Sequence, residues 1–185
     1  MISFCTPYTK DRIYQLDMVS PENEALCEEY GCEWIRLFWE DDWEWNMARA
    51  WNMAHEKASG DIQVTFGCDC FITRVYVEDL IKQFNENMDI LVTASNGGRI
   101  AISGENFKKL GGYDETMTGW GCEDLDMTYR ARALGLTCKL QVGIDFIPHS
   151  DHMRFPDADR KRYQYQNWAI MRSNFDNKII DWREK

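Results

Sequence analysis

The sequence predicts a single α/β domain in which a mostly parallel β-sheet lies between two layers of helices. Short apolar strands alternate with helical segments along the 185-residue chain, as in sheets whose strands are joined by crossover helices. No internal repeat or low-complexity tract interrupts this alternation, and the length suits one compact domain with a substantial core. In such sheets the ligand binds beyond the carboxyl ends of the strands.

Apolar periodicity and turn residues define the expected elements. We expect strands at residues 1–5, 33–39, 61–66, 89–94, 100–102 and 137–147. We expect helices at residues 20–30, 46–59, 77–84, 123–134 and 159–175, and a brief helix ending at Gly111. Ser20 and Pro21 are expected to begin the first helix, and residues 6–9 to form a turn after the first strand. In the last helix Tyr163, Trp168 and Met171 are available to pack back onto the domain.

The composition excludes several classes of protein. The net charge is −10, from 21 basic and 31 acidic residues, which argues against a nucleic-acid binder and against an anionic membrane surface. An acidic protein that binds an anionic substrate needs local basic groups or a metal ion. No apolar run approaches the ~20 residues of a membrane span, and the first residues lack the pattern of a signal peptide. The seven cysteines are an odd number, which favours free thiols and a cytoplasmic protein.

The stretch from Gly98 to Gly135 carries the most informative residues. Glu123 and Asp124 stand where a helix is expected to start, and acids in the first turn suit the helix dipole. The structural role alone therefore explains them, but a catalytic base at this place is equally consistent with the sequence. Trp120, between two glycines in the preceding loop, favours the functional interpretation because it places a flat ring beside the carboxylates.

Two further residues follow predicted strands and have metal-ligand chemistry. Asp69 is either a turn residue or a strand-end carboxylate that holds a divalent cation against a diphosphate. His149 is by itself more typical of a surface or core histidine, but its place at a strand end makes it a second candidate ligand. A histidine and an aspartate together suit Mn²⁺ better than Mg²⁺. Cys68 and Cys70 lack the two-residue gap of structural zinc sites, so zinc is rejected.

Taken in order, these motifs resemble the GT-A-fold glycosyltransferases, and most closely the β-1,4-galactosyltransferase and chondroitin-polymerase type. The segment GGRIAISGENFKKLGGYDETMTGWGCEDLDMTYRARALG is similar to their Gly-rich strand, F-x-x-x-x-G-[FY] turn and W-G-x-E-D helix start. Upstream, WNMARAWNMAHEKASGDIQVTFGCD is similar to their N-x-x-R-x-x-N helix, A-x-G-D turn and Asp-x-Asp strand end. The resemblance covers roughly residues 46–150, with a weaker start at residues 2–8. It implies a compact three-layer α/β/α nucleotide-diphospho-sugar transferase (GT-A) fold.

The resemblance also implies a role for each matching residue. Asp69 corresponds to the second Asp of Asp-x-Asp and His149 to the late metal-binding histidine, so both would hold Mn²⁺ or Mg²⁺. Glu123 and Asp124 correspond to the acidic pair that binds the acceptor, with Asp124 as the base of an inverting transfer. The residues expected to contact the substrates are Thr6, Pro7, Tyr8, Trp45, Asn46, Arg49, Cys68, Gly98 and Trp120.

These implications lead to one preferred function and two alternatives. We expect one domain over residues 1–185, with the nucleotide-binding half at 1–70 and the acceptor half and last helix at 71–185. It would move a sugar from a nucleotide sugar, most simply a UDP-sugar, to a carbohydrate or glycoconjugate hydroxyl. Gly67 stands where the family has its first Asp, and the part before Trp45 is short, which favours a sugar- or nucleotide-binding module without turnover as the alternative. A retaining transferase of the polypeptide N-acetylgalactosaminyltransferase type is a third possibility.

Overall fold

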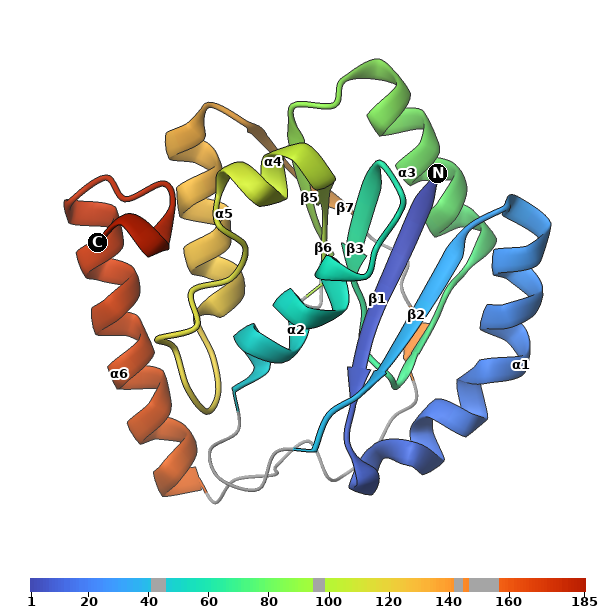
Figure 1. Cartoon of the computed structure of the whole chain (residues 1–185), viewed down its shortest axis with the longest axis horizontal. Helices are drawn as coiled ribbons and strands as arrows, with labels where there is room; N and C mark the ends of the chain where they lie inside the picture. Colours follow the sequence, from blue (N-terminus) through green and yellow to red (C-terminus); the bar gives the residue numbers. More distant parts are fainter. Residues whose placement is uncertain (41–45, 95–98, 142–144, 147–156) are drawn as a thin grey trace.

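The computed structural model describes residues 1–40, 46–94, 99–141, 145–146 and 157–185 (Figure 1). The strands are β1 (Ile2–Tyr8), β2 (Glu33–Phe38), β3 (Ile62–Thr65), β4 (Cys70–Phe71), β5 (Ile90–Ala94), β6 (Ile100–Ser103), β7 (Thr137–Gln141) and β8 (Asp145–Phe146). The helices are α1 (Ile13–Tyr30), α2 (Met47–Glu56), α3 (Arg74–Glu86), α4 (Gly104–Lys109), α5 (Glu123–Leu134) and α6 (Asp157–Asp176). Two short 3₁₀ turns, η1 (Lys10–Arg12) and η2 (Trp182–Glu184), complete the described elements.

Six strands form one sheet in the order β2-β1-β3-β6-β5-β7. The pairs β1–β2, β1–β3 and β5–β7 are parallel, whereas β6 runs antiparallel to both of its neighbours, β3 and β5. The predicted mostly parallel sheet is therefore confirmed, with β6 as the reversed strand. Because β6 is reversed, its first residues lie at the edge where β3 ends.

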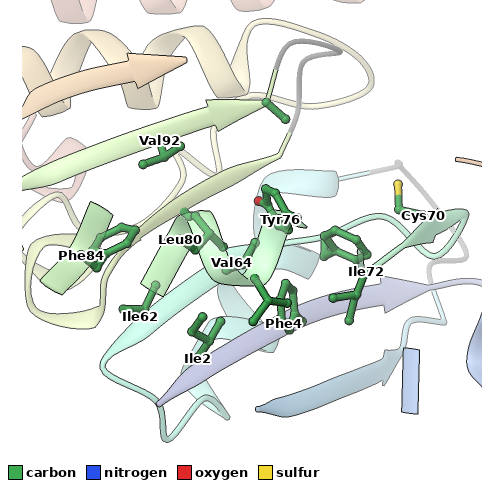
Figure 2. Packing of buried hydrophobic residues seen from close by; sticks show 14 of the residues in the cluster. Ile2, Phe4, Ile62, Val64, Cys70, Ile72, Tyr76, Leu80, Phe84 and Val92 are labelled. Carbon is green, nitrogen blue, oxygen red and sulfur yellow. The ribbon is translucent and has the colours of Figure 1, made fainter. Parts of the chain in front are cut away.

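Helices cover both faces of this sheet, which confirms the predicted three layers (Figure 1). On one face, Cys27 of α1 belongs to the same apolar cluster as the side chains of α3 that pack on β1, β3 and β5. Figure 2 shows Tyr76 and Leu80 of α3 beside Phe4 and Val64 of the strands. On the other face, α2, α4 and α5 pack through Trp51, Phe107 and Met127 among others. The last helix, α6, packs outside α5, where Met171 is buried against Met117 and Cys122. Trp168, which the sequence predicted to pack back, is 51% exposed instead.

The first strand is longer than predicted, because β1 continues through Thr6 and Pro7 to Tyr8 instead of turning. Beyond Cys5 the strand pairs only with β2, since its pairing with β3 ends at Cys5. The backbone carbonyl of Cys5 points toward β3 and accepts from the Phe66 N–H. Pro7 is two residues further along the strand, so its backbone groups point to the same side. The missing N–H of Pro7 therefore falls where the sheet has no partner strand, which a proline tolerates.

The first helix also begins earlier than predicted, at Ile13 instead of Ser20. Its buried residues are Leu16, Val19, Asn23 and Cys27, whose spacing of three and four residues runs straight through Pro21. Packing of this face thus outweighs the helix-breaking effect of an interior proline. Ser20 does not cap the helix; its hydroxyl donates to the Leu16 carbonyl at 2.7 Å.

The other predicted elements lie within a few residues of their expected positions, whereas β4 was not predicted. The expected strand at 137–147 is described as β7 and β8, with residues 142–144 outside the described part of the chain. Among the helices that the structure describes, none combines the length and the apolar character needed to span a membrane.

Candidate active site

The loop that carries Trp120 has an unusual backbone. Gly119 and Gly121 have φ angles of 73° and 94°, and Cys122, the N-cap of α5, has a φ of 75°. The left-handed region is costly for a residue with a Cβ, by about 1–2 kcal/mol. Such conformations persist only where the surrounding structure holds them, and they gather at functional sites. The loop is therefore a fixed conformation, and the glycines are needed for its shape.

Side chains from α2 and α6 hold this loop on both sides. The amide nitrogen of Asn167, a residue only 2% exposed, donates to the carbonyl oxygens of Thr118 and Gly121, each at 2.9 Å. Asn46, which caps α2, forms a bridge with Gly119 and donates to the Glu115 carbonyl at 2.9 Å. These contacts fix the two ends of the short segment at whose centre Trp120 stands.

Trp120 itself is 43% exposed. The guanidinium carbon of Arg160, at the start of α6, lies 5.4 Å from the centroid of the indole. One cation therefore lies against the ring at cation–π distance. The exposed remainder of the ring is available to a ligand.

Glu123 and Asp124 are the first two residues of α5, as predicted. Burial, and next the charge of Asp124, raise the pKa of Glu123 to about 7, although the backbone N–H groups of Glu123 and Gly121 act in the opposite direction. The positive end of the helix dipole by itself favours the ionised form of a carboxyl at this place. For Glu123 desolvation outweighs the helix dipole, so this carboxyl is partly protonated at neutral pH.

A buried hydrogen-bonded chain lies beneath the pair. The Tyr113 hydroxyl is 2.7 Å from the Thr65 hydroxyl, which in turn is 2.9 Å from Nε2 of His55. Burial raises the pKa of Tyr113, and the charges of Asp124 and Glu123 add to that rise. Tyr113 thus stays a neutral phenol next to the carboxylates and ties their surroundings to β3.

A second buried network fixes α5 from its other side. Arg130, 1% exposed, donates to Asp126 at 2.6 Å and to the carbonyl oxygens of Leu110 and Gly112. Asn174 of α6 bridges Asp126 and Asp114 at 2.8 and 2.9 Å. Arg130 lies in the second half of α5. Its position beneath the 110–114 turn shows that α5 is held by charge-assisted hydrogen bonds as well as by apolar packing.

Asp69, the predicted metal ligand, lies just after β3 and forms an ion pair. The Nη2 atom of Arg99 is 3.5 Å from its Oδ1 atom and 2.7 Å from the Cys70 sulfur. Burial raises the pKa of the Cys70 thiol to about 12, so the sulfur is a neutral thiol. A Cβ at Gly67 would come within 2.5 Å of the Asp69 Oδ1 atom and 3.1 Å of the Arg99 Nη2 atom. The absence of a side chain at position 67 is therefore what makes room for this pair.

The residues predicted to bind the nucleotide from β1 differ in accessibility. Thr6 and Pro7 are buried, and the Thr6 hydroxyl accepts a hydrogen bond from the Trp34 indole at 2.9 Å. Tyr8 is partly exposed, and its ring lies 5.4 Å from that of Phe38. Tyr8 is therefore the one of the three whose side chain can reach a ligand without rearrangement.

The remaining candidates divide between described and undescribed parts of the chain. Arg49 is exposed on α2, and Cys68 is partly buried beside Asp69, where burial raises the pKa of its thiol to about 12. Three predicted residues lie outside the described residues, namely Trp45, Gly98 and His149. The structure brings Trp120, Glu123, Asp124 and Asn46 to one loop and helix end, and it places Asp69 and Cys68 together after β3.

Among the described residues, Asp69 is the predicted ligand for a divalent cation. In the portion of the chain that the structure describes, no three His, Cys, Asp or Glu side chains gather into a metal-binding group. The partly exposed carboxylate of Asp69 has the chemistry of one oxygen ligand, and it already attracts a cation. Asp69 thus has the chemistry of a single oxygen ligand, and the second predicted ligand, His149, lies outside the described residues.

Sequence reasoning missed the residues that support the site. Asn167 was read only as part of a helix, Tyr113 as part of a turn, and Arg99 as a neighbour of the Gly-rich strand. For Arg99 a signal was available, since an acidic protein that binds an anionic substrate needs a local basic group, and Arg99 directly precedes β6. For Asn167 and Tyr113 no local signal exists, because their partners lie 46 to 49 positions away.

Comparison with known proteins agrees with this architecture. Residues 83–166 match the family model described as the N-terminal domain of galactosyltransferase. No curated protein sequence matches the chain. Among solved structures, the catalytic domain of Drosophila β1,4-galactosyltransferase 7 in complex with xylobiose matches with a TM-score of 0.67 and 19% identity, covering 87% of this chain and 79% of that chain.

Two further structures show the same fold. A mutant of the Drosophila enzyme in complex with manganese, UDP-Gal and xylobiose matches with a TM-score of 0.66 and 18% identity, over 88% of this chain and 79% of that chain. GalNAc-T7 with UDP, GalNAc and Mn²⁺ matches with a TM-score of 0.62 and 11% identity, over 92% of this chain but 47% of that chain. The chain therefore has the GT-A fold of these glycosyltransferases, and its residues 83–166 match the family model of the galactosyltransferase N-terminal domain.

Proposed function

We propose that this domain transfers a sugar from a UDP-sugar to a carbohydrate hydroxyl with inversion at the anomeric carbon. The observation that carries the proposal is the carboxyl pair at the start of α5, directly after the rigid loop that presents Trp120. The two carboxyl groups are adjacent but their surroundings differ, and the pKa of Glu123 is raised to about 7. A carboxyl whose pKa lies near neutral pH, in a loop-and-helix site of this kind, supports an acid–base role for this site.

In this proposal Asp124 is the base, and Glu123 binds the acceptor. A carboxyl that is partly protonated at neutral pH donates a hydrogen bond to a sugar oxygen, but it is a poorer proton acceptor than a carboxylate. Asp124 takes the proton of the attacking hydroxyl while the sugar rests beside Trp120. The loop contacts of Asn46 and Asn167 supply the fixed orientation on which the rate of such a bimolecular step depends.

The donor is proposed to lie across residues 1–70, beyond the ends of β1 and β3. Tyr8, Cys68 and Asn46, with Trp45, would contact the nucleotide, and Asp69 with His149 would hold a divalent cation such as Mn²⁺. When bound, such a cation acts as a Lewis acid that neutralises the departing diphosphate. The manganese in the galactosyltransferase and GalNAc-T7 complexes supports this proposal. That all seven cysteines are free supports a reducing, cytoplasmic environment.

The experiment is a donor panel with and without metal. UDP-sugars are incubated with xylobiose and other oligosaccharides, and both hydrolysis and transfer are measured for the wild type and Asp69→Ala. We expect transfer that a chelator and Asp69→Ala both suppress, with a product of inverted anomeric configuration. Turnover that survives both changes contradicts the role of Asp69, and a product of retained configuration contradicts Asp124 as base.

A binding module without turnover is the second candidate. The ion pair between Asp69 and Arg99, and the absence of a side chain at Gly67, favour it because the predicted metal ligand already has a cationic partner. Measurable UDP binding without hydrolysis or transfer from any donor would support this candidate against the transferase.

A further inference from the structure

We propose that Arg99 is a diphosphate-binding residue of the donor site, so that the domain binds the nucleoside diphosphate even before the divalent cation that transfer requires. The inference rests on the proposed nucleotide-sugar donor. It concerns a residue to which neither the sequence motifs nor the comparisons give a role.

Because β6 is antiparallel, Arg99 lies at the edge of the sheet where β1 and β3 end and where the nucleotide sugar is proposed to bind. Val64 of β3 pairs with Ala101 of antiparallel β6, so Arg99 lies opposite Phe66, at the point where β3 runs into Gly67. The Arg99 carbonyl accepts from the Ala94 amide at 3.0 Å, which closes the β5–β6 pairing and fixes the backbone of the residue. A basic residue of the second half of the chain thus stands among the strand-end residues of the first half.

The contacts of Arg99 aim its guanidinium at the group that was predicted to hold a metal. Its Nη2 atom is 2.7 Å from the Cys70 sulfur and 3.5 Å from the Asp69 carboxylate. Both charged side chains are less than one-fifth exposed, at 18% for Arg99 and 17% for Asp69. A guanidinium is weakly hydrated and presents several donors in a fixed plane, which suits two phosphate groups held side by side.

The space beside Arg99 is consistent with this role. A Cβ at Gly67 would lie 3.1 Å from the Arg99 Nη2 atom, 3.0 Å from the Cys70 sulfur and 2.5 Å from the Asp69 carboxylate. Because position 67 has no side chain, the Arg99 guanidinium can lie close to its backbone. Asp69 is the one carboxylate among residues 67–70. With a net charge of −10, the protein has a general need for such a local cation against a diphosphate.

Arg99 and Asp69 then have opposite effects on an anion. Without a divalent cation, the guanidinium attracts the diphosphate and the Asp69 carboxylate repels it. Removal of the Arg99 charge should therefore weaken nucleotide binding, and removal of the Asp69 charge should strengthen it. If nucleotide binding itself required the metal, both changes would weaken it, because loss of the ligand Asp69 would also weaken binding.

The test is titration calorimetry of the full chain with UDP and with uridine, in EDTA and in Mn²⁺. The variants are Arg99→Gln, Arg99→Lys and Asp69→Asn, with Arg172→Gln as the matched control. Arg172 is also an ion-paired arginine, 3.0 Å from Asp176 on the exposed side of α6. Circular dichroism checks that each variant folds, and Arg99→Lys retains the charge if Arg99→Gln does not fold.

We expect the wild type to bind UDP in EDTA and Arg99→Gln to weaken that binding by roughly tenfold or more, the worth of a hydrogen bond to a charged group. Uridine should bind both proteins equally. Arg99→Lys should fall between them, Asp69→Asn should bind UDP more tightly in EDTA, and Arg172→Gln should match the wild type.

The proposal is overturned if the wild type binds UDP only with Mn²⁺ or not at all, if Arg99→Gln binds as the wild type does, or if Asp69→Asn also weakens binding in EDTA. Failure of the proposed function is a separate outcome. Metal-free UDP binding without sugar transfer from any donor contradicts the transferase and leaves the role of Arg99 intact. Sugar transfer by a protein that binds UDP only with Mn²⁺ contradicts the role of Arg99 and leaves the transferase intact.

Discussion

Asp124 stands next to Glu123 at the start of α5, and its charge adds to the burial that raises the pKa of Glu123 to about 7. Because a raised pKa means that the folded state binds a proton more tightly than the unfolded chain, the carboxyl of Glu123 costs no stability below its ordinary pKa of 4.5. The cost appears as the pH rises from about 4.5 to 7 and is complete above that range.

Glu123→Gln should therefore change how stability depends on pH. At pH 4 the variant and the wild type should unfold at similar denaturant concentrations, whereas at pH 8 the variant should be more stable by about 1–3 kcal/mol. Urea titrations across this range measure the difference. A constant difference at all pH values would contradict the raised pKa.

Asn167→Asp tests the support of the Trp120 loop. The substitution keeps the size of the side chain but removes the N–H groups that bind the Thr118 and Gly121 carbonyls. We expect a loss of about 1–3 kcal/mol in unfolding free energy, because a buried charge replaces satisfied hydrogen bonds. The KM for the acceptor should rise while UDP affinity stays unchanged. Gln166→Glu, the same kind of change at an exposed neighbour, serves as the control and should have little effect on either quantity.

Two glycines give a matched test of the loop conformation. Gly119 and Gly135 both have positive φ angles, but a Cβ at Gly119 would meet the Tyr163 ring at 2.1 Å, whereas a Cβ at Gly135 has nothing within 4 Å. Gly135→Ala should cost about 1 kcal/mol of unfolding free energy through backbone strain alone. Gly119→Ala should cost about 2–4 kcal/mol because overpacking adds to the strain. Equal costs in thermal unfolding would show that Tyr163 does not fill the space beside Gly119.

Arg130→Met tests the buried network beneath the loop. Removal of the guanidinium leaves Asp126 as an uncompensated buried charge and the Leu110 and Gly112 carbonyls without their donor. Loss of one partner of a buried ion pair costs about 3–5 kcal/mol. Arg132→Met, on the exposed side of the same helix, should change the free energy of unfolding by less than about 1 kcal/mol. Similar losses for both variants would contradict the structural role of Arg130.

The sequence predicted those parts of the fold that depend on local patterns. Alternating strands and helices, the glycine that ends α5 and the carboxylates that start it follow from periodicity and capping, and the structure has them in place. The predicted start of α1 was wrong, because the proline at position 21 suggests a helix boundary that tertiary packing overrides. The extension of β1 was missed because Pro7 is tolerated only where a neighbouring strand has ended, which depends on the register of β3.

The candidate site was predictable to a similar degree. Trp120, Glu123 and Asp124 could be found from their spacing, whereas the raised pKa of Glu123 could not, because desolvation depends on the packing around it. The Asp69–Arg99 pair joins residues that are 30 positions apart. The sequence does not predict this pair, because it depends on the antiparallel direction of β6 beside β3. The roles of these residues in binding and catalysis remain predictions.

The most direct test of the proposed transferase compares Asp124→Asn with the wild type in sugar transfer and in UDP binding. Glu105→Gln is the matched control, since Glu105 is also a first-turn carboxylate but is exposed and paired with Lys109 on α4. If Asp124 is the base, Asp124→Asn lowers the transfer rate by roughly 10²–10⁴-fold and leaves UDP affinity unchanged, while Glu105→Gln behaves as the wild type. A parallel loss of transfer, UDP affinity and thermal stability in Asp124→Asn would contradict the catalytic role and leave only a structural one.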